Sequence, residues 1–112
     1  MKIARLVVLL GAISGFSAWA ASDSSKGAEA LRLVAQGDSL FAEDRWEEAK
    51  RAYRKALRKD SEQILALEGL GEIALEREKW EEAKDWQGRI LKQEPRNIDA
   101  LYRRGICYRE TS

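Results

Sequence analysis

Small and apolar residues recur at helical spacing from Ala28 to the end of the chain. Residues three, four and seven positions apart share one face of an α-helix, so two marked sets predict two successive helices. The first set is Leu33, Gln36, Gly37 and Leu40, and the second is Trp46, Ala49, Tyr53, Ala56 and Leu57. Between them, Asp44 is followed three residues later by Glu47, which predicts a helix N-cap with its capping-box partner. With one proline in the chain, this pattern predicts an all-α fold.

The same pattern repeats along the chain. The five residues from Trp46 to Lys50 recur letter for letter from Trp80 to Lys84, at an offset of 34 residues. The same offset relates three glycines and three leucines, which are Gly37, Gly71, Gly105, Leu33, Leu67 and Leu101. A period of this length is typical of helical repeat proteins, whose units bury their apolar faces only by stacking.

These residues resemble the tetratricopeptide repeat (TPR), in which leucines, a glycine and an aromatic mark the first helix and an alanine, an aromatic and a proline the second. The resemblance covers residues 28–112 and implies an α-solenoid of antiparallel helix hairpins, with units at about 30–63, 64–97 and an incomplete 98–112. The residues expected to pack within and between units are Gly37, Trp46, Ala49, Tyr53, Gly71, Trp80, Ala83, Pro95, Gly105 and Tyr108. The sequence departs from the family pattern at Gln36, Ala74, Gln87 and Arg104, and Trp86 is expected to compensate in part for Gln87.

The resemblance also implies a binding surface, since the family usually binds partners in the concave groove formed by the first helices. The repeat phase places ten residues there, namely Val34, Asp38, Phe41, Leu65, Glu68, Glu72, Leu75, Tyr102, Ile106 and Arg109. Their acidic and apolar character predicts an extended peptide partner with basic and apolar groups. Relatives that clamp an acidic peptide C-terminus carry Lys and Asn where Val34, Asp38 and Glu72 stand, so that mode is disfavoured.

The N-terminus predicts export. Lys2 and Arg5 precede an apolar stretch, and Ala18 and Ala20 provide the small residues of a signal peptidase site. We therefore expect residues 1–20 to be a signal peptide, residues 21–27 to be a flexible leader, and the mature protein to reside in the periplasm or outside the cell. The alternative is an inner-membrane anchor formed by residues 1–20, and only this alternative brings the chain into contact with a membrane.

Composition excludes several kinds of chemistry. The chain has no histidine and one cysteine, Cys107, so it lacks the residues for imidazole catalysis or for a histidine- or cysteine-rich metal site. We expect no enzymatic activity, no cofactor and no metal, and we interpret Cys107 as a packing residue. A net charge of +1 gives no overall attraction to nucleic acid. The basic run from Lys50 to Lys59 is interpreted as a solvated helix face, and no nucleic acid partner is expected.

The last predicted helix, from about Ile98 to Glu110, carries apolar residues that no later helix of the sequence covers. Three interpretations remain open: the helix caps the array, a second copy covers it, or the sequence is the N-terminal part of a larger exported repeat protein with further repeats or a catalytic domain downstream. The leading hypothesis is a non-catalytic interaction scaffold of the bacterial cell envelope, which binds a protein or peptide partner through the groove or the C-terminal end.

Overall fold

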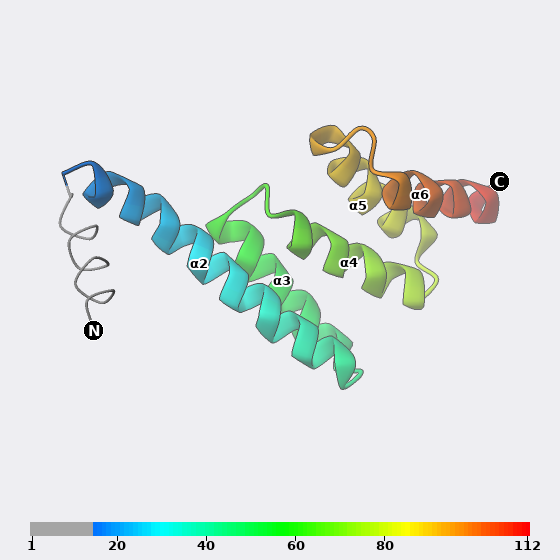
Figure 1. The fold of residues 1–112 in the computed structure, drawn as a ribbon. Helices are drawn as coiled ribbons and strands as arrows, with labels where there is room; N and C mark the ends of the chain where they lie inside the picture. The colour runs from blue at the N-terminus through cyan, green and yellow to red at the C-terminus, as the bar shows by residue number, and fades with distance from the viewer. Residues whose placement is uncertain (1–14) are drawn as a thin grey trace, which may run out of the picture.

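The computed structural model describes residues 15–112, with side chains from residue 25 onward. This part of the chain forms five α-helices and no strand. The helices are α2 (Gly15–Ala42), α3 (Trp46–Lys59), α4 (Ile64–Glu76), α5 (Trp80–Gln93) and α6 (Ile98–Thr111). Short turns join them, and each hairpin packs against the next (Figure 1). The expected all-α architecture is confirmed.

The first described helix is longer than the sequence pattern predicts. α2 begins at Gly15, so it includes residues 21–27, for which the sequence predicts a flexible leader. The segment contains no proline, and its single glycine costs a helix only about 1 kcal/mol. The predicted signal peptide, residues 1–20, lies mostly outside the described residues.

The turns within the two hairpins follow one pattern. Asp44 and Glu78 adopt positive φ values of 60° and 55°. In the first turn, the Asp44 amide donates to the Phe41 carbonyl and the Arg45 amide to the Leu40 carbonyl, which is the hydrogen-bond pattern of a Schellman motif. Asp44 therefore ends α2 and does not cap α3, whose N-cap is Arg45, so the predicted capping box is wrong.

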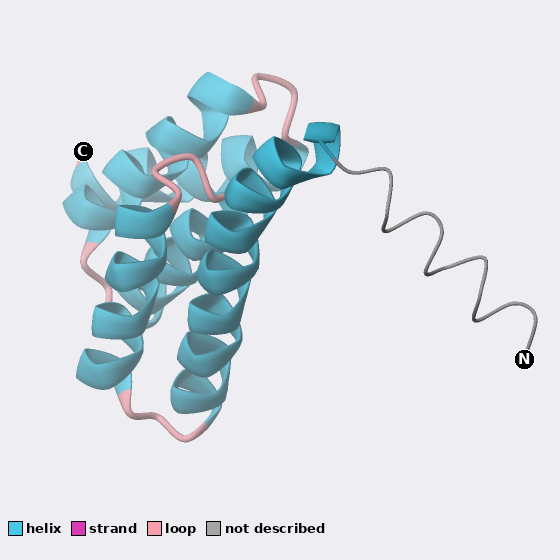
Figure 2. Cartoon of the chain, turned by 90° about the vertical axis from the view of Figure 1, so that its left-hand side faces the viewer, coloured by secondary structure: helices cyan, strands magenta, loops and turns pink. Residues whose placement is uncertain are grey.

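The first helices of the three units, α2, α4 and α6, alternate along the chain with the second helices, α3 and α5. Helices that follow one another in the chain pack side by side, as the hairpin nearest the viewer in Figure 2 shows. The core consists of three clusters: one between the first hairpin and α4, one around Leu67 and Ile90, and one around Ala83 and Cys107. Trp86 packs against all three, so this single side chain links the successive units.

Small residues set the spacing of the helices. Ala49 and Ala83 are fully buried at the two hairpin crossings. An added Cβ at Gly37 would lie 2.7 Å from Cε1 of Tyr53, and one at Gly71 would lie 2.6 Å from Nε2 of Gln87. The glycines thus admit a side chain from the second helix of each hairpin, which is why the repeat keeps them in phase.

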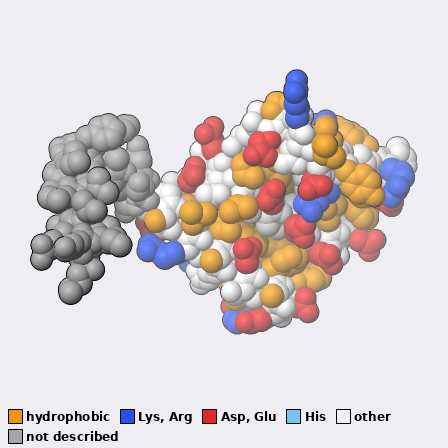
Figure 3. All heavy atoms as spheres, viewed as in Figure 1, with side chains coloured by type: hydrophobic (Ala, Val, Ile, Leu, Met, Phe, Trp, Pro, Cys, Tyr) orange, Lys and Arg blue, Asp and Glu red, His pale blue; other side chains and the backbone are white. Residues whose placement is uncertain are grey.

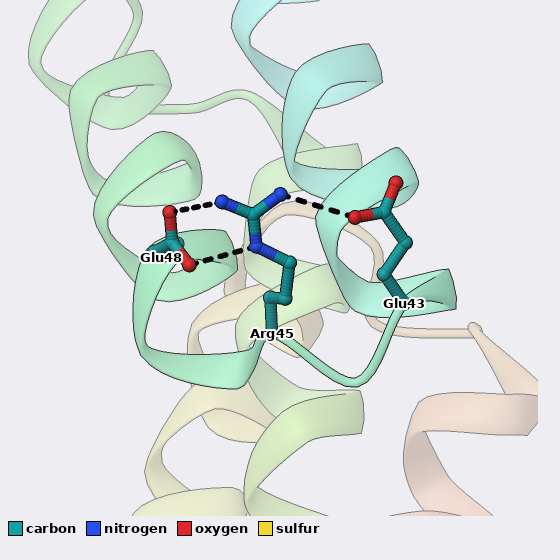
Figure 4. A network of polar contacts seen from close by, with 3 residues as sticks. All are labelled: Glu43, Arg45 and Glu48. Carbon is teal, nitrogen blue, oxygen red and sulfur yellow. Dashed lines mark hydrogen bonds and ion pairs between the residues drawn. The ribbon is translucent and has the colours of Figure 1, made fainter.

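Polar contacts join the first unit to the second at the surface. Arg77 lies over the ring of Trp46, 5.5 Å from its centroid, and pairs with Glu47 at 3.4 Å. Beside the first turn, Arg45 donates two hydrogen bonds to Glu48, at 2.8 and 2.7 Å, and one to Glu43 at 3.1 Å (Figure 4). Because this network is exposed, its main effect is to fix the turn geometry, and its contribution to stability is small.

Candidate binding groove

A groove of about 380 Å³ crosses the layer formed by the first helices. Its lining comes from all three of them and from one side chain of α3, and consists of Asp38, Phe41, Tyr53, Leu65, Glu68, Gly69, Glu72, Asp99 and Arg103. Figure 3, drawn from the viewpoint of Figure 1, shows acidic side chains along the middle of the molecule, with apolar side chains between them. The stacking of units, and not any one helix, creates this concave surface.

Four carboxylates and one guanidinium face this groove. Arg103 of α6 pairs with Glu72 of α4 at 2.8 Å, and so connects the second unit to the third. Burial raises the pKa of Glu68, and the nearby Arg103 only partly opposes that shift. The groove holds one guanidinium for four carboxylates, so a cation entering it would favour the ionised form of Glu68.

Tyr53 forms the floor of the groove. Its hydroxyl donates a hydrogen bond of 2.5 Å to Oδ1 of Asp38. Burial and this hydrogen bond raise the pKa of Tyr53 far above its ordinary value, so the phenol stays protonated and remains a donor. The bond holds Asp38 in place and leaves its second oxygen for another donor, because a carboxylate accepts several hydrogen bonds.

The structure places the ten predicted groove residues in different surroundings. Asp38, Phe41, Leu65, Glu68 and Glu72 line the groove together. Val34 is only 4% exposed and belongs to the first core cluster, because α2 packs against α4 as well as α3, so its placement in the groove is wrong. Leu75 packs against the third core cluster. Tyr102, Ile106 and Arg109 lie outside the groove lining, with Tyr102 and Arg109 exposed and Ile106 half-buried.

Sequence reasoning missed three lining residues of the first helices. Asp99 follows Leu65 by 34 residues, so the repeat phase could have found it. Gly69 and Arg103 are related by the same offset, and Ala35 stands at their position in the first unit. Because three different residue types occupy that position, the sequence gives no sign that it lines the groove. Only the packing of α4 against the Tyr53 ring shows why Gly69 is needed.

The predicted packing residues also divide into two groups. Gly37, Ala49, Tyr53, Gly71 and Ala83 are buried, and Trp46 and Trp80 pack at the edges of the core. Pro95 is exposed in the turn before α6, while Gly105 and Tyr108 are exposed on α6 itself. None of these three belongs to the core of the described chain, although the Tyr108 ring has Nζ of Lys84 on α5 at 4.9 Å from its centroid.

Other chemistry is sparse in the part of the chain that the structure describes. Its acidic and cysteine side chains form no group of three that could hold a metal ion. None of the helices from residue 15 onward combines the length and the apolar character needed to cross a bilayer. Cys107 is fully buried, and burial raises the pKa of its thiol, which agrees with its interpretation as a packing residue.

Comparison with known proteins decides the family. The profile of the tetratricopeptide repeat matches residues 34–89, which is half of the chain. The chain belongs to the tetratricopeptide repeat family. No curated protein matches it. Among solved structures, it is similar to the C-terminal TPR-containing domain of a putative FK506-binding protein of Plasmodium falciparum, with a TM-score of 0.68 and 22% identity over 76% of this chain and 67% of that one.

The structural likeness shows the fold, and the family gives a general manner of working. TPR domains generally mediate contacts between proteins, and they are generally scaffolds without catalytic activity of their own. The identity of a partner depends on the residues of the individual groove, because one repeat architecture supports many unrelated roles.

Proposed function

We propose that this chain is a non-catalytic interaction scaffold whose groove binds an extended peptide rich in basic and apolar side chains. The observation that carries the proposal is the charge of the groove: Asp38, Glu68, Glu72 and Asp99 face a single cation, Arg103. Because Arg103 already pairs with Glu72, the remaining negative charge is available to a ligand.

The raised pKa of Glu68 supports a basic ligand in particular. A Lys or Arg side chain beside Glu68 would favour its ionised form, and a charge-assisted hydrogen bond formed there would be stronger than one between neutral groups. An acidic ligand would instead add to a repulsion that the groove already contains.

Apolar side chains complete the surface. Phe41, which is half-buried, and Leu65, which is 48% exposed, both line the groove. A peptide that alternates basic and apolar residues would place one kind against the carboxylates and the other against these two side chains. Aromatic residues are common anchors of binding surfaces, so Phe41 is the first candidate for the main apolar contact.

The test is isothermal titration of the full chain with a ten-residue peptide of alternating lysine and leucine, compared with a glutamate and leucine peptide of equal length. We expect the lysine peptide alone to bind. Glu68→Gln should weaken it by about tenfold or more, since a hydrogen bond to a charged group contributes about 1.5–3 kcal/mol. Added salt should weaken it as well.

Glu62→Gln is the matched control, because Glu62 is exposed in the turn before α4 and does not line the groove. It removes the same charge and should leave the affinity unchanged. Equal binding of the two peptides, or equal effects of Glu68→Gln and Glu62→Gln, would show that the groove carboxylates do not select the ligand.

We also propose that the scaffold acts in the cell envelope after export. The supporting features are the basic start at Lys2 and Arg5, the apolar stretch after it, and Ala18 and Ala20. N-terminal sequencing of the protein isolated from a bacterial host should find Ala21 as the first residue. A chain that retains Met1 and stays in the cytoplasmic fraction would contradict export, and one that retains Met1 in the membrane fraction would support the anchor.

A further inference from the structure

One side of α6 is covered by no other residue that the structure describes. On α4, Leu67 and Ala74 are each 1% exposed. The residues 34 positions later on α6, Leu101 and Tyr108, are 44% and 53% exposed. The same repeat positions are thus buried in one unit and open in the next.

The reason is the second helix of each hairpin. The Tyr53 ring of α3 sits against Gly37, and the Gln87 amide of α5 sits against Gly71. Gly105 is the third glycine in this series, and a Cβ built there would meet nothing within 4 Å. In both complete hairpins, a side chain from the antiparallel second helix therefore occupies the space over the repeat glycine.

A groove of about 620 Å³ lies between α5 and α6, and its α6 lining residues, Arg104 and Tyr108, flank Gly105 along the helix. Its charge is mostly positive. Among the side chains that the structure describes, Arg89, Lys92 and Arg104 form no ion pair, although all three line this groove. Lys84 is already paired with Glu81 at 2.8 Å, and Asp85 is the single acid in the lining.

We propose that this groove docks an amphipathic α-helix of a partner protein, with an acidic flank facing Arg89, Lys92 and Arg104. The docked helix lies on α6 as α5 lies on α4, and one of its side chains fills the space over Gly105. Tyr108, with Lys84 at 4.9 Å and Arg104 at 5.9 Å from its ring centroid, forms the wall of the site and keeps these cations beside the groove.

The positive charge of the groove favours an acidic partner helix over a second copy of the chain. The outer face of α3 carries the exposed residues Arg51, Arg54, Lys55 and Arg58. Docking α3 of another copy would bring these cations toward Arg89 and Lys92, and like charges placed together oppose association. The site also shares no lining residue with the acidic groove, and it selects a ligand of opposite charge.

The probe is a peptide of residues 80–93, which is α5 itself, with every Lys and Arg replaced by Glu and with a hydrocarbon staple on its outward side. It keeps the apolar face that α5 presents to α4 and carries an acidic flank. The matched control has the same apolar face, with every Asp and Glu replaced by Lys. Fluorescence anisotropy with the full chain should show binding of the acidic probe only.

Two variants make the test specific. Gly105→Gln fills the site without meeting any residue of the folded chain, so it should fold normally and weaken the acidic probe by about tenfold or more. Gly27→Gln, at an open helical glycine far from this groove, should not change the affinity. Charge reversal of Arg89 and Lys92 to Glu should transfer binding to the basic probe, while Glu68→Gln should have no effect.

Failure of the acidic probe to bind would overturn the proposal, and so would equal binding by the wild type and Gly105→Gln. Light scattering of the chain without any probe provides the remaining outcome. A dimer that Gly105→Gln converts to a monomer would show that a second copy occupies the groove and would also overturn it.

Discussion

The ring of Tyr53 is held between two glycines, and this contact gives the sharpest stability test. A Cβ added at Gly69 on α4 would lie 2.6 Å from both Cε1 and Cε2 of the ring, and closer still to Cζ. On the opposite side, the Cβ position of Gly37 on α2 is 2.7 Å from Cε1. The ring cannot retreat from Gly69→Ala without moving α2, and its hydroxyl is bonded to Asp38.

The magnitude follows from two opposing effects. Overpacking a core costs about 1–3 kcal/mol, and a ring enclosed on both sides should cost the upper part of that range. Alanine in place of a helical glycine returns up to about 1 kcal/mol. The backbone adds no strain, since no described glycine has a positive φ. We expect Gly69→Ala to lower the free energy of unfolding by about 2 kcal/mol, or the Tm by roughly 8–16 °C for a domain of this size.

Thermal and urea unfolding followed by circular dichroism provide the assay, with Gly105→Ala as the matched variant. Gly105 is also helical but has no neighbour, so its alanine should raise stability by up to about 1 kcal/mol. A double-mutant cycle isolates the ring contact: in a Tyr53→Ala background, Gly69→Ala should no longer destabilise the protein. If Gly69→Ala stabilised the wild type as much as Gly105→Ala does, the argument from the ring would be wrong.

Three further predictions concern single residues. Glu78→Gly should raise the free energy of unfolding by about 0.5–1 kcal/mol in urea titrations, because glycine adopts the positive φ of that turn without strain; a loss of stability would contradict this. Cys107 should resist a thiol reagent such as DTNB at neutral pH until the protein is unfolded, because it is buried and its pKa is raised; rapid labelling of the folded protein would refute it. Burial raises the pKa of Glu68, so acidification should neutralise it before a glutamate in water and weaken a basic peptide, and this step of the pH profile should disappear in Glu68→Gln. The free energy of unfolding should change in the opposite sense to peptide binding. A raised carboxyl pKa means that the folded state binds the proton more tightly, so Glu68 should reduce stability as the pH rises through that pKa.

Much of the fold follows directly from the order of residues. The offset of 34 residues between the two Trp-Glu-Glu-Ala-Lys segments predicts helical hairpins, and the phase of Gly37 and Gly71 places small residues where the second helices approach. This works because the faces of a helix depend only on its period, so a repeated pattern predicts a repeated packing arrangement. Asp38 and Glu72 in the groove could be predicted for the same reason.

Other features depended on neighbours that no local pattern specifies. Val34 and Glu68 share a repeat position, yet Val34 is in the core and Glu68 is in the groove, because each helix is covered by different partners. Asp44 is a residue type that is common at helix N-caps, yet its backbone has the positive φ of the turn that ends α2. Aspartate suits both positions, and the packing of α2 on α3 selects the second one. The sequence by itself determined the repeat and the side chains available on each helix face. Only the tertiary structure decided which of those faces became core, groove or open surface, because burial depends on which helices stack beside each one.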